Sequence, residues 1–135
     1  TTLDSELTHS EMRRVRILKS DTQGHELNVL RGATALLKAG AKHKNLAVYV
    51  EFDPFLLEES GSSAEQLLSF LHGIGYSCAL ASETLCVKLS KPMARKTGRQ
   101  AVQKCWNDLY CRSHWEAASH TCARLDESVF WRYAS

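Results

Sequence analysis

Hydrophobic positions in the first part of the chain change their period twice. Residues 15–19 form a short run rich in branched aliphatic side chains, which is typical of a strand. From Glu26 onward apolar residues recur at helical spacing, which predicts a helix over residues 26–39 that ends at Gly40. Residues 46–50 are continuously apolar, as expected of a parallel strand that is covered on both faces.

The alternation of strand and helix continues after this strand. Ser63, followed three residues later by Gln66, has the form of a capping box at the start of a helix. Apolar residues between positions 67 and 74 supply the buried face of that helix. Strand, helix, strand and helix in succession are typical of βαβ units. The sequence therefore predicts an α/β fold with a mostly parallel sheet and flanking helices.

The last part of the chain has a weaker pattern. Residues 76–80 and 84–89 both favour strand, either as two strands or as one that is interrupted. Residues 106–111 are rich in aromatic side chains, which favours a final strand over an extended helix. Residues 113–135 have no clean period, and we expect their aromatic side chains to pack them onto the rest of the domain.

Length and composition fit one soluble globular domain. The 135 residues are 44% hydrophobic and 24% charged, which excludes a disordered or fibrous chain. No stretch is long and apolar enough to cross a membrane, and the N-terminus has no signal-peptide pattern, so the cellular location stays open.

The charge is small overall but unevenly distributed. A net charge of +2 does not indicate nucleic-acid binding, and no specific nucleic acid is expected. Six Lys and Arg residues without an acidic one lie between Lys88 and Lys104. This basic loop is either a solvated segment or a surface for an anionic or acidic partner.

Five cysteines leave at least one unpaired within the chain. Cys78 and Cys86 have apolar neighbours, which favours reduced core residues, whereas Cys105, Cys111 and Cys122 lie in the last third. A zinc site that used Cys111, Cys122 and the two histidines between them would fit no standard ligand spacing, so no metal is predicted. One disulfide in the tail is the favoured alternative.

One segment carries a specific resemblance. Residues 19–33, Lys-Ser-Asp-Thr-Gln-Gly-His-Glu-Leu-Asn-Val-Leu-Arg-Gly-Ala, resemble the segment that identifies FkbM-type methyltransferases. Thr-Leu-Asp at residues 2–4, Val-Glu-Phe-Asp-Pro at 50–54 and the Leu-Leu-x-Phe-Leu…Gly-Tyr pattern at 67–76 are similar to further family features in the same order. Asn-Asp-Leu-Tyr-Cys at 107–111 resembles the family's closing strand.

The resemblance implies a Rossmann-like methyltransferase fold, of which residues 1–112 would be the C-terminal portion and residues 113–135 a packed extension. The family's glycine-rich cofactor turn and its ribose-binding acid lie before the Thr-Leu-Asp segment, and these residues contain neither. We therefore expect a fold that is incomplete in its N-terminal half and that binds S-adenosylmethionine weakly, or not at all, on its own.

The resemblance also implies a site. Ligands of open α/β sheets bind at the carboxyl ends of the strands, and Asp21 and Glu51 follow two such ends. Asp21, His25 and Glu51 are the candidate catalytic residues, since methyl transfer to a hydroxyl needs a proton acceptor. Asp21 and Gln23 are the candidate contacts to the cofactor, whereas Lys19 and Glu26 are expected to hold the turn together.

Two functions of different classes follow. The first is S-adenosylmethionine-dependent methyl transfer to a hydroxyl group, with the cofactor-binding half supplied elsewhere. The second is a noncatalytic, methyltransferase-derived subunit of a larger assembly. In either case we expect another polypeptide to cover the open edge of the sheet, because proteins avoid exposing a long apolar strand edge.

Overall fold

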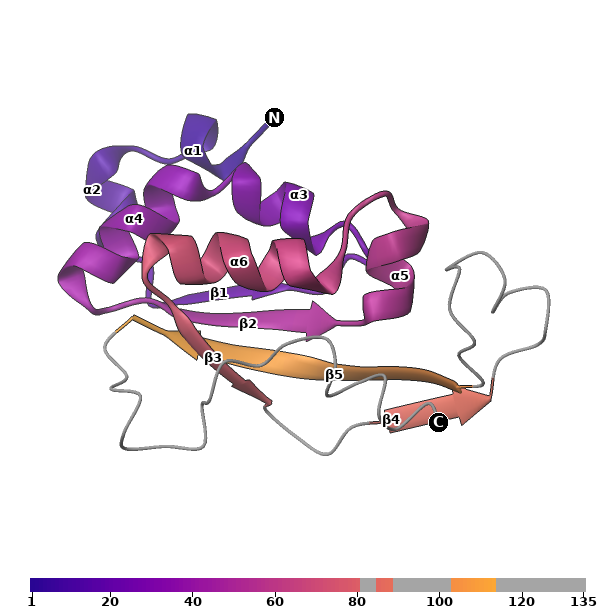
Figure 1. The fold of residues 1–135 in the computed structure, drawn as a ribbon. Helices are drawn as coiled ribbons and strands as arrows, with labels where there is room; N and C mark the ends of the chain where they lie inside the picture. The colour runs from indigo at the N-terminus through magenta and orange to yellow at the C-terminus, as the bar shows by residue number, and fades with distance from the viewer. Residues whose placement is uncertain (81–84, 89–102, 114–135) are drawn as a thin grey trace.

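The computed structural model describes residues 1–80, 85–88 and 103–113, and Figure 1 shows their arrangement. In chain order the elements are α1 (Leu3–Glu6), α2 (His9–Met12), β1 (Ile17–Ser20), α3 (Glu26–Arg31), α4 (Thr34–His43), β2 (Ala47–Phe52), α5 (Pro54–Glu59), α6 (Ala64–Ile74), β3 (Ser77–Leu80), β4 (Leu85–Lys88) and β5 (Gln103–Arg112). The predicted α/β class is confirmed. Residues 114–135, on which the predicted packing of the C-terminal segment depends, and residues 89–102 of the predicted basic loop lie outside the described residues.

The sheet is mixed, so the prediction of a mostly parallel sheet is wrong. Its order is β1-β2-β5-β3, and β4 also pairs with β5. β1 and β2 are parallel, whereas β5 is antiparallel to β2, β3 and β4. Parallel neighbours need a crossover connection, usually a helix, and no described helix follows α6. β1, β2 and β3 therefore share one direction, and β5 returns between β2 and β3 in the other.

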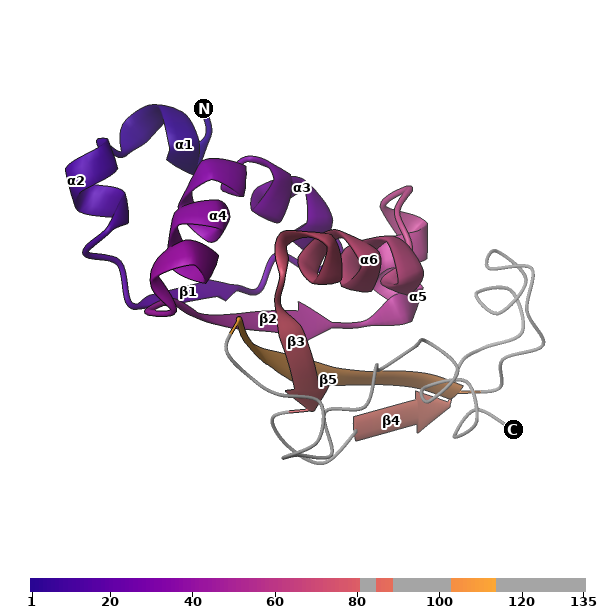
Figure 2. The same ribbon diagram turned by 60° about the vertical axis from the view of Figure 1, so that its left-hand side comes forward.

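The six helices of the described residues lie on one face of the sheet (Figures 1 and 2). In β1, β2 and the part of β5 from residue 108 on, alternate side chains point into the core beneath them, among them Leu18, Val50 and Leu109. On the opposite face Tyr49 of β2 contacts Tyr110 of β5, with ring centroids 4.7 Å apart, and Ile17 of β1 is 63% exposed. Within the described residues β1 pairs with β2 alone, so β1 is an edge strand.

The predicted helix over residues 26–39 is two helices, α3 and α4, which meet at Gly32 and Ala33. Gly40 does not end the second helix, which continues to His43 and is capped by Lys44 in the left-handed conformation. Gly40 is instead a packing site, because a Cβ there would lie 2.5 Å from Leu46 Cβ. The prediction for Gly40 was wrong because a glycine needed for close packing has the same local signature as a terminator.

The N-terminal segment is fixed to the junction between α3 and α4. The Asp4 carboxylate accepts hydrogen bonds from the Ala35 and Leu36 N–H groups, at 2.8 and 3.1 Å, and so caps α4. The Asp4 N–H in turn donates to the Gly32 carbonyl at 3.0 Å. These contacts explain physically why the Thr-Leu-Asp segment accompanies the segment at residues 19–33.

The prediction of a reduced Cys78 is wrong. Cys78 of β3 and Cys111 of β5 are direct partners in the antiparallel ladder and form a disulfide, with Cα atoms 4.0 Å apart. The two cysteines are 33 residues apart in sequence, so only the pairing of the strands brings them together. Because Cys111 is bonded to Cys78, it is not available as the zinc ligand considered above.

Candidate functional site at the ends of β1 and β2

The turn after β1 is built around the buried carboxylate of Glu26, which is 1% exposed. Glu26 accepts hydrogen bonds from the Thr22 N–H at 2.7 Å, the Gly24 N–H at 3.0 Å and the Thr22 hydroxyl at 3.0 Å. Three donors from one turn compensate for the burial of this carboxylate. The contacts agree with the expectation that Glu26 holds the turn together.

The turn is also fixed to α5. Gly24 has φ +102°, and a Cβ at this position would lie 2.3 Å from the Leu56 carbonyl oxygen. The Ser60 hydroxyl donates to the Gly24 carbonyl. Glycine is therefore required twice here, for its backbone conformation and for the close approach of α5.

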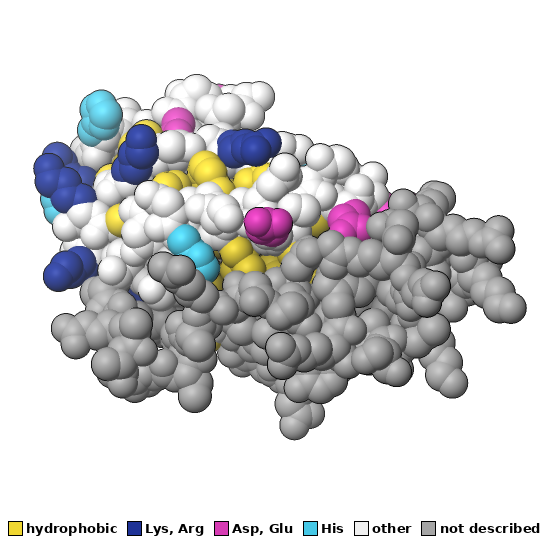
Figure 3. All heavy atoms as spheres, viewed as in Figure 1, with side chains coloured by type: hydrophobic (Ala, Val, Ile, Leu, Met, Phe, Trp, Pro, Cys, Tyr) yellow, Lys and Arg dark blue, Asp and Glu magenta, His cyan; other side chains and the backbone are white. Residues whose placement is uncertain are grey.

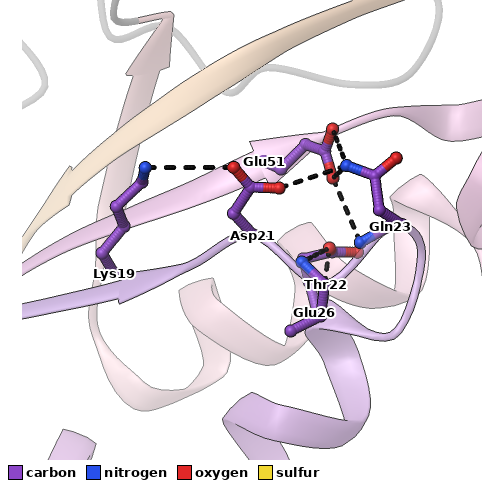
Figure 4. A network of polar contacts seen from close by, with 6 residues as sticks. All are labelled: Lys19, Asp21, Thr22, Gln23, Glu26 and Glu51. Carbon is purple, nitrogen blue, oxygen red and sulfur yellow. Dashed lines mark hydrogen bonds and ion pairs between the residues drawn. The ribbon is translucent and has the colours of Figure 1, made fainter.

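Gln23 connects the two strand ends (Figure 4). Its side-chain Nε2 lies 3.2 Å from Asp21 Oδ1 and 3.1 Å from Glu51 Oε1, and its backbone N–H donates to Glu51 Oε2 at 3.3 Å. Gln23 has φ +53°, an uncommon conformation for a residue other than glycine and one that recurs at functional sites. The structure thus brings together Asp21, Gln23 and Glu51.

Glu51 has an unusual protonation equilibrium. Burial raises the pKa of Glu51 to about 7, and the neighbouring carboxylates of Asp21, Glu26 and Asp53 act in the same direction. The hydrogen bond from the Gln23 N–H opposes them only in part. At neutral pH Glu51 therefore exchanges readily between its protonated and its ionised form, as a general base or acid must.

Asp53 is a member of this environment that the sequence analysis did not single out. It is 2% exposed and accepts hydrogen bonds from the Phe55 and Leu56 N–H groups, both at 3.1 Å, at the start of α5. Its signal was present in the sequence, because an Asp that precedes a Pro at the first helical position is a typical helix start. Thr22 was likewise missed.

Two predicted residues have looser positions. Lys19 Nζ lies 3.9 Å from Asp21 Oδ2, with both side chains about half exposed or more, so this ion pair contributes little stability. His25 is exposed at the N-cap of α3 and makes no capping hydrogen bond with its side chain. It is not one of the six residues of the network in Figure 4.

The two ends of the parallel strands differ in charge. Arg13, Arg14 and Arg16 precede β1, and Lys42 and Lys44 precede β2. Figure 3 shows Lys and Arg side chains gathered at the end of the helical face where α2 and α4 lie. The carboxylates of the site lie at the opposite, carboxyl ends of the strands, so this end favours a positively charged ligand group.

Two kinds of feature are not found in the described part of the chain. No group of three or more His, Cys, Asp or Glu side chains is placed to hold a metal ion. Among the same residues, no helix combines the length and the apolar character that a membrane span needs.

Comparison with known proteins identifies the family. Residues 1–78 match the model of the methyltransferase FkbM domain. These residues make up more than half of the chain and include the whole network around Gln23. Strand β5 lies beyond the matched residues, so the resemblance expected at residues 107–111 stays a prediction. No curated protein and no solved structure gave a match. The chain belongs to the FkbM methyltransferase domain family.

Proposed function

We propose that Asp21, Gln23 and Glu51 form the acceptor side of an S-adenosylmethionine-dependent methyltransferase site that acts on a hydroxyl group. One observation carries this proposal: a single amide bridges two carboxylates at the carboxyl ends of parallel strands. Burial of one of them, Glu51, raises its pKa to about 7. The family supports the reaction class, and the position of the network agrees with where open α/β sheets bind ligands.

Glu51 has the properties of the proton acceptor. A hydroxyl that attacks a methyl group must lose its proton, and a base with a pKa near the working pH is the most efficient acceptor. In its ionised form Glu51 takes this proton at a carboxylate oxygen. Gln23 Nε2 and the Gln23 N–H hold both oxygens of Glu51 in position, so the orientation of the base is fixed before the substrate arrives.

The residues present fit only part of the cofactor. S-adenosylmethionine supplies an electrophilic methyl group on a positively charged sulfonium, and Asp21 and Gln23 would hold its polar, cationic end. The glycine turn of the site does not suit the nucleoside end, because Leu56 already occupies the space beside Gly24. We therefore propose that a different segment of polypeptide supplies the nucleoside site, and that this chain alone binds S-adenosylmethionine weakly or not at all.

Calorimetric titration of the chain with S-adenosylmethionine tests the division of the site. We expect no measurable heat of binding, and a Kd in the micromolar range would show that the cofactor site is misplaced. In an assembly with a complete cofactor site, Glu51→Gln is expected to lower kcat by about 10²- to 10⁴-fold with little change in the KM for the cofactor. Glu65→Gln, the same chemical change at an exposed position of α6, is the matched control and should retain kcat. An unchanged kcat in Glu51→Gln would refute the role of Glu51.

A second function, a noncatalytic subunit of a larger assembly, is favoured by the exposed edge of the sheet. Ile17 in the edge strand β1 is 63% exposed. In a parallel strand alternate residues direct their backbone groups to opposite sides. The Arg16 carbonyl accepts a hydrogen bond from the Ala47 N–H, so the backbone groups of Arg16 face β2. Ile17 and Lys19 therefore present their backbone groups outward, where a strand of another polypeptide can pair with them.

Sedimentation distinguishes this second function. At roughly 50 µM, a concentration at which exposed strand edges associate, we expect the chain to dimerise or aggregate. Ile17→Lys should reduce the association because a charge at an edge opposes pairing. Tyr49→Lys, on the same open face but in the inner strand β2, is the matched control. A stable monomer of the unmodified chain would rule out the subunit hypothesis and leave the catalytic one intact.

A further inference from the structure

Strand β5 contains two cysteines, and each is the register partner of a cysteine in a neighbouring strand. Cys111 is the register partner of Cys78 in β3, and these two form the disulfide described above. Six residues earlier in β5, Cys105 is the register partner of Cys86 in β4. The backbone therefore places four of the five cysteines of the chain as two facing pairs along one strand.

The second pairing depends on a shift in register between β3 and β4. Leu80 pairs with Leu109 and Leu85 with Trp106, so five steps along β3 and β4 correspond to three steps along β5. In the unshifted register of β3, Cys86 would face Gln103, and only the shift places it opposite Cys105.

Positions along β5 alternate with a period of two. Cys105 and Cys111 are six residues apart, an even number, and both lie in the same continuous strand. Cys105 therefore stands at the same phase of the pleat as Cys111, which already forms a cross-strand disulfide. Directly opposed residues of antiparallel strands have Cα atoms about 4.5 to 5.5 Å apart, and a disulfide bridges Cα separations of about 4.4 to 6.8 Å.

We propose that Cys86 and Cys105 form a second cross-strand disulfide, so that β5 is covalently joined to both β3 and β4. Two thiols lose two protons and two electrons as the sulfur–sulfur bond forms. The electrons reduce a disulfide oxidant of the glutathione type to two thiols, by way of a mixed disulfide with one of the cysteines. The bond closes a loop that contains the basic run from Lys88 to Lys104 and leaves Cys122 as the one cysteine outside both pairs.

Peptide mapping of the 135-residue chain tests this pairing. The chain is refolded in a glutathione redox buffer, its free thiols are alkylated under denaturing conditions, and it is digested without reduction. Trypsin, Glu-C and Asp-N together separate the cysteines, with Cys86 in residues 84–88, Cys105 in 105–107 and Cys111 in 108–112. We expect a cross-linked species of residues 84–88 with 105–107, which reduction converts into its two component peptides.

Two variants sharpen the test. Cys105→Ser should leave Cys86 alkylated and preserve the link between Cys78 and Cys111, which also reports that the sheet has folded. Cys122→Ser should leave the cross-linked species unchanged. The proposal is overturned if Cys86 and Cys105 are both alkylated in the unmodified chain while Cys78 and Cys111 remain linked, or if either of the two is joined to another cysteine.

Discussion

Removal of the Cys78–Cys111 disulfide should lower the free energy of unfolding by an amount that its position fixes. The bond joins residues 33 apart in sequence. For a loop of this length the chain-entropy relation gives about 12.5 cal/mol/K, or about 3.7 kcal/mol at 25 °C. For a domain of this size each kcal/mol shifts Tm by roughly 3 to 5 °C, so the midpoint should fall by about 10 to 20 °C.

The perturbation is the double substitution Cys78→Ala and Cys111→Ala. Both cysteines are buried, at 1% and 0% exposed, so the loss of two sulfur atoms from the core adds a packing cost to the entropic one. Every protein compared carries Ser at positions 86, 105 and 122, so that only one disulfide loop can close. Urea unfolding with and without reductant then separates the two costs.

The difference between the double variant and its parent should be about 4 kcal/mol or more without reductant. With the disulfide of the parent reduced, the difference should shrink to the packing cost alone, on the order of 1 kcal/mol. Equal differences under both conditions would refute the reasoning, because they would show that the bond between β3 and β5 does not constrain the unfolded chain.

Three further substitutions test the site. Gly24→Ala should destabilise the chain by about 1 to 3 kcal/mol or more, because the added Cβ would meet the Leu56 carbonyl. Gly61 has a similar positive φ but open space around it, so Gly61→Ala should cost less, and thermal unfolding measures both. Asp53→Ala should lower the free energy of unfolding by about 1 to 2 kcal/mol because it removes the cap of α5, whereas Asp53→Asn should lower it much less. Equal losses of stability in urea unfolding would contradict the capping role. Because the folded pKa of Glu51 lies above its ordinary value of 4.5, its contribution to stability is full below pH 4.5 and is lost as pH rises through about 7. Glu51→Gln should remove this part of the pH dependence, and an unchanged stability profile from pH 4.5 to 8 would count against the raised pKa.

The sequence predicted the elements whose signals are local. The strands at residues 15–19 and 46–50, the parallel relation of β1 and β2 and the helix that begins after Ser63 all follow from hydrophobic period and capping residues, and the structure confirms them. The preference for a strand near residues 106–111 is also confirmed by β5. The short helices α1, α2 and α5 were missed because four to six residues give too few repeats to establish a period.

The errors concern features that depend on distant residues. The antiparallel return of β5 between β2 and β3, the disulfide of Cys78 and the packing role of Gly40 are all set by partners that are not neighbours in sequence. The candidate site shows both cases. Asp21 was chosen because it follows a strand, and the structure places it just after β1. Glu51 was expected to follow the next strand but lies within β2, one residue before its end. The bridge through Gln23 depends on a left-handed backbone that no local pattern indicated.

The midpoint of the Glu51 titration tests the central claim most directly. The side-chain carboxyl ¹³C resonance of Glu51, assigned by its absence in Glu51→Gln, can be followed from pH 3 to pH 9 in the folded chain. We expect a midpoint near pH 7, and a lower midpoint in Asp21→Asn, because that substitution removes a neighbouring negative charge. A midpoint close to the ordinary value of 4.5 would contradict the assignment of Glu51 as a base poised for proton transfer at neutral pH.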